Sequence, residues 1–237
     1  MRWIDAGALA VVAAGVMAGG WAQTSGPPAM PVPPPPVQVQ PRFVVALDAA
    51  HGGSDTGARF GQDILEKDIT LALSVHLRSL LHARGIEVVT TRESDIDVPL
   101  LNRAETANHA QAAACLVLHA TPTGSGIHLF TSSLNPAPSA RLLPWDTAQA
   151  PYITQSLKLE SEIDTALAHS EIPVTLGRAS VQPMDHLTCP EVAVEMAPLV
   201  GGHVSHPRDI TDAAYQKQVV ESLAAALEQW RSDWKQP

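Results

Sequence analysis

Residues 43–53 read FVVALDAAHGG, and this stretch decides the class of fold. Its first five residues, Phe43 to Leu47, form a continuous apolar run, which is typical of a strand buried on both faces of a sheet. A glycine-rich loop follows at His51, Gly52 and Gly53. We therefore predict a central strand that leads into a loop carrying a histidine.

Strand and helix patterns alternate along the rest of the chain. Residues 66–84 carry apolar side chains at helical spacing, and Gly85 stands just past their end as a stop signal. Further strands are predicted at 86–90, 115–118, 126–130 and 192–194, and further helices at 100–114, 152–168 and 212–230. This alternation predicts a single α/β domain with a mostly parallel twisted sheet flanked by helices.

Composition excludes several classes of protein. The chain has 237 residues, and its 15 Lys and Arg against 24 Asp and Glu give a formal net charge of -9, which argues against nucleic acid as a partner. Only two cysteines are present, Cys115 and Cys189, so the chain is neither a disulfide scaffold nor a cysteine-rich zinc finger. The sequence leaves open whether these two form a disulfide or are two small buried residues.

The N-terminal part has the features of an export signal followed by a tether. Arg2 precedes an apolar run, and Gly20-Trp21-Ala22 offers a small-x-small cleavage site, so we predict a signal peptide at residues 1–22. The alternative is an uncleaved N-terminal membrane anchor. Residues 23–41 are expected to be a proline-rich linker, because residues 27–41 hold eight of the 20 prolines. The folded domain is predicted at 42–237, exported to the periplasm.

Polar side chains follow three of the predicted strands. His51 follows the first strand, His119 ends the strand at 115–118, and Glu195 ends the strand at 192–194. Glu66 stands where the first long helix begins. Ligands of open α/β sheets bind beyond the carboxyl ends of the strands, and two histidines with a carboxylate can bind zinc and leave a position open for water. His128, His169 and His186 carry no usable signal, and His203 and His206, although spaced like a metal pair, are expected in a surface loop.

Six stretches in order resemble the zinc-dependent N-acetylmuramoyl-L-alanine amidases, the Amidase_3 family. They are residues 45–58 (VALDAAHGGSDTGA), 66–73 (EKDITLAL), 80–92 (LLHARGIEVVTTR), 100–108 (LLNRAETAN), 116–120 (LVLHA) and 190–195 (PEVAVE). Any one of these motifs is weakly specific. The six together span nearly all of residues 43–228, so the resemblance as a whole is specific.

The resemblance implies a role for each of the four residues. His51, Glu66 and His119 would be ligands of Zn²⁺ at the carboxyl ends of the strands, and Glu195 would be the general base. The reaction would be hydrolysis of the amide between N-acetylmuramic acid and L-alanine of peptidoglycan, with a zinc-bound water as the nucleophile. Asp55, Arg92 and Arg103 are expected to shape or fix the surrounding loops.

The chain also departs from the family pattern. Ala49-Ala50 replaces Pro-Gly before the first histidine, and Val117 and Thr121 replace Ser and Asn around the second. Residues 196–202 (MAPLVGG) also depart from the family pattern after Glu195. The changes around His119 and after Glu195 keep open a non-catalytic cell-wall-binding homologue, and a zinc hydrolase of soluble muropeptides is a further alternative. Because all four functional positions are intact, we favour the amidase. We expect a monomer acting on peptidoglycan or muropeptides, and the need for an activator protein is left open.

Overall fold

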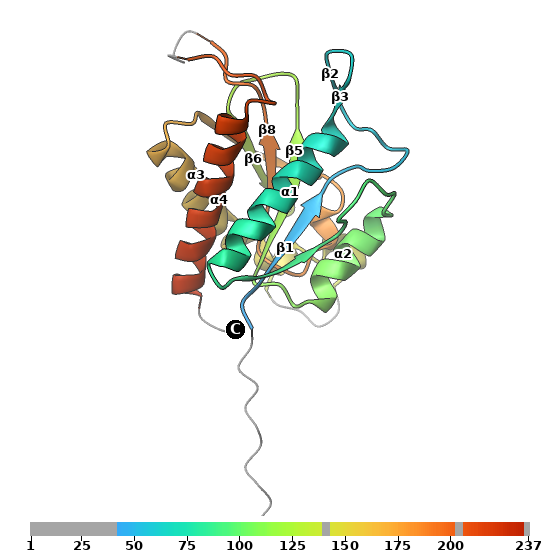
Figure 1. The fold of residues 1–237 in the computed structure, drawn as a ribbon. Coiled ribbons are helices and arrows are strands. Elements are labelled where there is room, and N and C mark those ends of the chain that lie inside the picture. The colour runs from blue at the N-terminus through green and yellow to red at the C-terminus, as the bar shows by residue number, and fades with distance from the viewer. Residues whose placement is uncertain (1–41, 139–142, 202–205, 235–237) are drawn as a thin grey trace, which may run out of the picture. The chain divides into compact units, whose positions relative to one another are not determined.

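A six-stranded sheet with strand order β4-β1-β5-β8-β6-β7 forms the centre of the fold (Figure 1). Its strands are β1 (Val44–Ala49), β4 (Glu87–Thr90), β5 (Ala114–Ala120), β6 (Ile127–Ser132), β7 (Val174–Ala179) and β8 (Glu191–Met196). Neighbouring strands run parallel except β6 and β8, which are antiparallel. The computed structural model describes residues 42–138, 143–201 and 206–234. The predicted signal peptide and the whole of the predicted linker lie outside these ranges.

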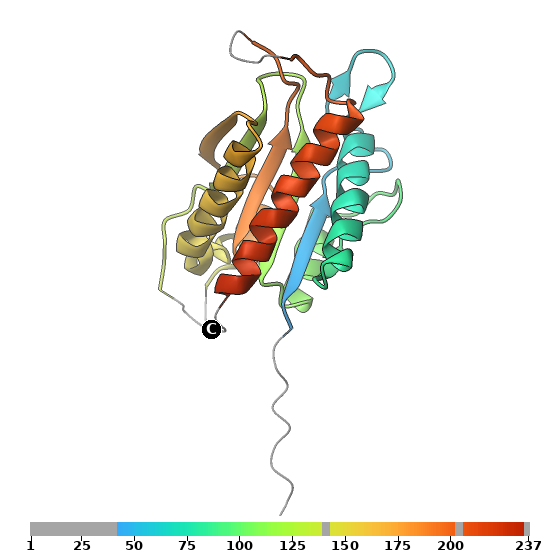
Figure 2. The ribbon, with the colours of Figure 1, turned by 60° about the vertical axis from the view of Figure 1, so that its left-hand side comes forward.

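Helices cover both faces of the sheet. Figure 2 shows three of them side by side over one face: α1 (Glu66–Ala83), α4 (Ala213–Asp233) and α3 (Ile153–His169). The shorter helix α2 (Leu100–His109) packs against β1 and β4 from the other face. The single α/β domain with a mostly parallel sheet is therefore confirmed. Within the described residues, no helix is long and apolar enough to cross a membrane.

Alternation along the strands sorts the side chains into two cores. Leu116 and Leu118 of β5 belong to the core under α1, α3 and α4, whereas Cys115 and Val117 belong to the core on the α2 face. Because residues two apart in a strand share a face, His119 lies on the α2 face. The same parity places Glu195 of β8 and His128 of β6 on that face.

Several details differ from the sequence-based expectations. The helix predicted at 100–114 ends at His109, because Gln111 has φ +50°, which breaks the helical conformation before the chain enters β5. Strand β7 was not predicted, since it lies at the sheet edge, where its side chains are half-buried or exposed. The hairpin β2 (Arg59–Phe60) and β3 (Ile64–Leu65) consists of strands too short to give a pattern.

The structure also decides between the two alternatives for the cysteines. Cys115 of β5 and Cys189, which precedes β8, form a disulfide with a Cα–Cα distance of 6.1 Å. Both residues are buried in the core on the α2 face. The bond therefore joins the beginnings of two neighbouring central strands.

Candidate metal centre

Three side chains from three separate elements converge at the carboxyl end of the sheet. His51 follows β1, Glu66 is the first residue of α1, and His119 lies near the end of β5. Glu66 Oε2 lies 3.1 Å from His51 Nε2, and Glu66 Oε1 lies 2.9 Å from His119 Nδ1. Each residue offers one ligand atom within 4.8 Å of the other two. The structure thus brings the three predicted ligands together.

The Glu66 carboxylate sits in a pocket of hydrogen-bond donors. Its oxygens also accept the backbone N–H groups of Ala58 at 2.8 Å and Ala120 at 3.1 Å. Burial opposes ionisation, but the hydrogen bonds with His119, His51 and these two amides outweigh it and hold the pKa of Glu66 well below its usual range. Its hydrogen bond with Glu66 is in turn the main cause that raises the pKa of His51. The cluster is therefore built around an ionised carboxylate.

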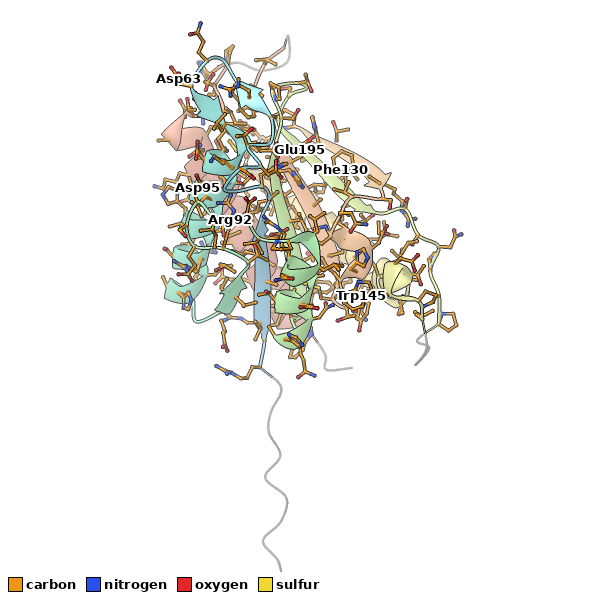
Figure 3. The ribbon with its side chains drawn as sticks, turned by 90° about the vertical axis from the view of Figure 1, so that its right-hand side faces the viewer. Asp63, Arg92, Asp95, Phe130, Trp145 and Glu195 are labelled. Atoms are coloured by element: carbon orange, nitrogen blue, oxygen red, sulfur yellow. A yellow bond between two sulfur atoms is a disulfide. The ribbon has the colours of Figure 1, made fainter. Side chains whose placement is uncertain are left out.

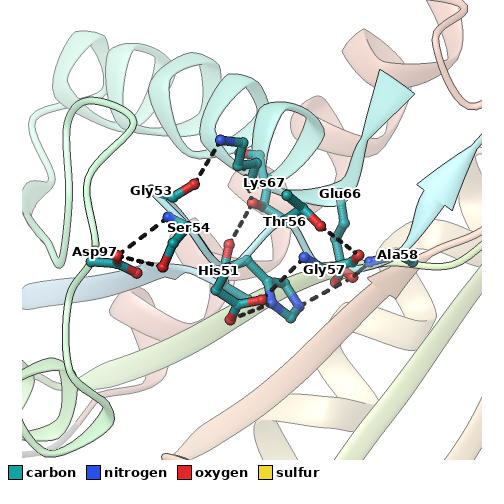
Figure 4. A network of polar contacts seen from close by, with 12 residues as sticks. His51, Gly53, Ser54, Thr56, Gly57, Ala58, Glu66, Lys67 and Asp97 are labelled. Carbon is teal, nitrogen blue, oxygen red and sulfur yellow. Dashed lines mark hydrogen bonds and ion pairs between the residues drawn. The ribbon is translucent and has the colours of Figure 1, made fainter. Parts of the chain in front are cut away.

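The loop after β1 fixes the orientation of His51 (Figure 4). Asp55 Oδ2 lies 2.9 Å from His51 Nδ1, and Asp55 Oδ1 accepts the Gly57 backbone N–H at 3.1 Å. Gly57 has φ +63°, and a Cβ there would lie 2.6 Å from both Glu66 Oε2 and His51 Cδ2. Only glycine therefore leaves room for the carboxylate and the imidazole to meet. Asp55 shapes the loop, as expected, and also contacts the first histidine.

Two buried arginines tie this loop to the rest of the domain. Arg103 of α2 forms an ion pair with Asp48 Oδ1 at 2.7 Å and donates to the His51 carbonyl at 2.7 Å. Arg92, labelled in Figure 3, donates to the Ala49 carbonyl at 2.8 Å. The two arginines therefore hold the loop through hydrogen bonds, which agrees with the role expected for them.

Further contacts around the loop were not anticipated from the sequence. Lys67 Nζ donates to the Gly53 carbonyl at 2.8 Å and pairs with Asp95 at 2.6 Å. Asp97 accepts from Ser54 Oγ at 2.8 Å (Figure 4). Asp95 and Asp97 belong to the segment between β4 and α2, which has no regular pattern, so no sequence signal could have placed them beside the histidine loop.

Glu195 lies beside the cluster rather than in it. On strand β8 it stands opposite His119 of β5 on one side and opposite His128 of β6 on the other. The three residues therefore form one row across the α2 face of the sheet. His128 Nδ1 lies 2.7 Å from Glu195 Oε2. Nothing in the sequence singles out His128, because its partner is set by an antiparallel register that the sequence does not reveal.

The chemistry of the three ligands suits a divalent metal ion. Two imidazoles and an ionised carboxylate are a ligand set that zinc accepts while keeping a fourth position open. His119 Nε2 is buried and has no hydrogen-bond partner among the described residues. A buried polar nitrogen is normally bonded, so this atom calls for a partner that the described residues do not supply. The site residues therefore fit a bound metal.

Comparison with known proteins agrees with this geometry. AmiC of Escherichia coli O6:H1, an N-acetylmuramoyl-L-alanine amidase, is 27% identical over 244 residues, which cover 87% of this chain but only 57% of AmiC. The catalytic domain of CwlV from Bacillus (Paenibacillus) polymyxa var. colistinus shares the fold with a TM-score of 0.62 at 20% identity, covering 80% of this chain and 98% of that domain.

A second solved structure has the same fold. It is the CwlD amidase from Clostridioides difficile in complex with the GerS lipoprotein, with a TM-score of 0.62 and 20% identity over 81% of this chain and 98% of CwlD. The family model described as N-acetylmuramoyl-L-alanine amidase matches residues 45–229. The chain therefore belongs to the Amidase_3 family of N-acetylmuramoyl-L-alanine amidases.

Proposed function

We propose that the protein hydrolyses the amide bond between N-acetylmuramic acid and the L-alanine of peptidoglycan stem peptides. One observation carries the proposal: His51, Glu66 and His119 converge at the end of the sheet, and Glu195 stands in the next strand beside them. Membership of the amidase family supplies the substrate class. The proposed substrates are peptidoglycan and its muropeptides, and the protein is proposed to act on them as a monomer.

Zn²⁺ is the proposed cofactor, held by His51, Glu66 and His119. When bound, zinc supplies a Lewis acid that polarises the amide carbonyl and lowers the pKa of a water toward about 7. Glu66 is kept ionised by its hydrogen bonds, so it is ready to bind a cation without losing a proton first. Asp55 would hold the His51 ring in place while the other ring nitrogen faces Glu66.

Glu195 is the proposed general base. Its side chain is 30% exposed, which leaves it within reach of substrate, and His128 occupies only one of its two oxygens. Glu195 would take a proton from the attacking water as the new C–O bond forms at the lactyl carbonyl. It would then pass that proton to the nitrogen of L-alanine as the C–N bond breaks, which yields a free amine and a carboxylic acid that ionises to the carboxylate by releasing the second proton of the water.

Three departures from the family pattern lie in the packed interior of the domain, and a fourth, Thr121, is partly buried in the loop after β5. Ala49, Ala50 and Val117 are all buried, and Val117 packs in the core on the α2 face. The three buried substitutions change packing, and their side chains are closed off from a polymeric substrate. This placement supports the enzyme over a non-catalytic wall-binding homologue, which remains the rival hypothesis.

We further propose that residues 1–22 direct export to the periplasm and that residues 23–41 act as a linker ahead of the catalytic domain at 42–237. The peptidoglycan sacculus lies in that compartment, so export brings the enzyme to its substrate. Cys115 and Cys189 form a disulfide, which is a bond that persists in oxidising compartments. That bond supports an exported protein.

Product analysis tests the function. Zinc-loaded protein is incubated with purified peptidoglycan and, separately, with soluble muropeptides, and the products are identified by mass spectrometry beside Glu195→Gln. We expect free stem peptides that begin at L-alanine, absent from the variant. Binding to peptidoglycan without release of peptides from either substrate would contradict an enzyme and favour the wall-binding homologue. Release from muropeptides alone would favour the soluble substrate.

A further inference from the structure

The His128 imidazole is the only described side chain that bonds to the Glu195 carboxylate. Nδ1 lies 2.7 Å from Oε2, and the two residues lie in adjacent antiparallel strands whose register pairs them directly. A cross-strand pair of this kind is fixed by two backbones and has little freedom to separate. Strand β8 lies between β5 and β6, so His128 bonds to the Glu195 carboxylate on one side, and His119 stands opposite Glu195 on the other side.

The His128 ring is itself confined by the loop between β5 and β6. Gly124 has φ +86°, and a Cβ at this position would lie 2.4 Å from His128 Cε1 and 2.5 Å from Nε2. The imidazole therefore lies directly against the glycine backbone, in space that any other residue would fill. The His128 side chain is only 15% exposed. Both the hydrogen bond and the packing restrict the ring to one orientation.

The hydrogen bond gives the two Glu195 oxygens different surroundings. Oε2 is engaged by His128, whereas Oε1 has no hydrogen-bond partner among the described residues. An ionised carboxylate accepts only, so His128 must present a proton on Nδ1 to make this bond. One oxygen is thus anchored and the other is left for substrate.

We propose that His128 is a positioning residue that holds Glu195 in the orientation needed for proton transfer. The inference rests on the proposed function, because it assigns a helper to the proposed general base. A carboxylate free to rotate would spend part of its time with neither oxygen directed at the attacking water. Small misplacements of a catalytic group cost up to about 100-fold in rate. We therefore expect the loss of His128 to lower the rate of turnover and to leave the affinity for the metal unchanged.

Two substitutions separate the hydrogen bond from the presence of a ring. His128→Leu removes the donor, and His128→Asn keeps an amide N–H close to the position of Nδ1. We expect His128→Leu to lower kcat about 10- to 100-fold with KM changed less than about threefold, and His128→Asn to recover most of the rate. His169→Leu, which replaces an exposed histidine of α3, is the matched control and should behave as wild type.

Two further measurements do not depend on turnover. Zinc affinity should be the same in His128→Leu and wild type, because His128 lies outside the three-residue cluster. Nitrogen-15 NMR of wild-type protein should show His128 protonated on Nδ1, and Glu195→Leu should remove that preference. A neutral ring protonated on Nε2, or a His128→Leu variant with wild-type kcat, would overturn the inference.

The proposed function and this inference fail in different ways. Wild-type protein that hydrolyses neither peptidoglycan nor muropeptides would overturn the function itself. Wild-type hydrolysis that Glu195→Gln abolishes, together with full activity of His128→Leu, would overturn only the positioning role. A loss of activity in His128→Leu that His128→Asn does not recover at all would also count against the hydrogen bond.

Discussion

Asp55 Oδ2 lies 2.9 Å from Nδ1 of His51, which leaves the other ring nitrogen, Nε2, 3.1 Å from Glu66 Oε2. The imidazole is therefore held between two carboxylates. One of them belongs to the candidate metal cluster, and the other comes from the loop that carries the histidine. A metal-binding histidine commonly bonds through its second nitrogen to such a partner, which fixes the ring and raises its basicity.

Asp55→Asn should weaken zinc binding about 10- to 100-fold, because it removes the charged partner of His51. The substitution keeps an oxygen that can accept the Gly57 N–H, so the loop should keep its conformation. Competition with a chromogenic chelator measures the affinity. Asp63→Asn, in the exposed turn between β2 and β3, is the control (Figure 3). Equal affinity in Asp55→Asn and wild type would show that Asp55 serves the loop alone.

Arg103→Met should lower the free energy of unfolding by about 3–5 kcal/mol, because it leaves the buried Asp48 carboxylate without its cation. It also removes the donor to the His51 carbonyl, so zinc affinity should fall as well. Urea unfolding and zinc competition measure the two effects. Arg59→Met is the control, because this exposed guanidinium donates to the nearby carbonyl of Gln62. An Arg103→Met variant as stable as wild type would refute the role of the ion pair.

Replacing both Cys115 and Cys189 with Ala should destabilise the domain by about 2–5 kcal/mol. The disulfide joins residues with a sequence separation of 74, so its loss increases the conformational entropy of the unfolded chain. The measurement compares urea unfolding of wild type and variant, with and without reductant. Reductant should lower the stability of wild type toward that of the variant and leave the variant unchanged. A reductant-insensitive wild type would contradict a stabilising disulfide.

Glu191→Gln should make stability less dependent on pH. Burial raises the pKa of Glu191 to about 8, even though hydrogen bonds with Gln149 and the Ser132 amide oppose the shift. A carboxyl group with a raised pKa favours the folded state most below its ordinary pKa of 4.5, and that contribution is lost as the pH rises toward 8. Glutamine has nearly the same shape but does not titrate, so its contribution to stability does not fall as the pH rises.

The gain of Glu191→Gln over wild type should therefore be larger at pH 8 than at pH 5, by on the order of 2 kcal/mol. Urea unfolding at the two pH values measures the difference. Glu105→Gln, on the exposed side of α2, removes the same charge without burial and should show no such change. A Glu191→Gln variant whose stability follows that of wild type at both pH values would mean that Glu191 is ionised in the fold.

The sequence predicts the sheet because the strands and helices follow from short-range patterns, and the resemblance to the amidase family implies which residues form the metal cluster. His51 and His119 come at the ends of apolar runs, and Glu66 begins an amphipathic helix, so the ends of parallel strands bring them together. The contact of His128 with Glu195 depends instead on β6 running antiparallel to β8. No local pattern distinguishes an antiparallel strand here, and the same limit applies to the edge strand β7.

The loop contacts were beyond prediction for a different reason. Lys67, Asp95 and Asp97 hold the histidine loop from segments that are distant in sequence and carry ordinary surface residues. Such residues are usually solvated, and only the folded arrangement shows that they bond to Gly53 and Ser54. The motif around His51 therefore predicts the ligand but not the supports that fix its orientation.

Zinc titration of the metal-free protein, followed by amide hydrolysis of a muropeptide, tests most directly that the His51–Glu66–His119 cluster holds the catalytic metal. We predict no hydrolysis without metal, a linear rise with added zinc, and a sharp break at about one equivalent per chain. His119→Ala should show neither the break nor the activity, whereas His169→Ala should match wild type. Full hydrolysis by the metal-free protein, or activity in His119→Ala equal to wild type, would contradict the metal centre.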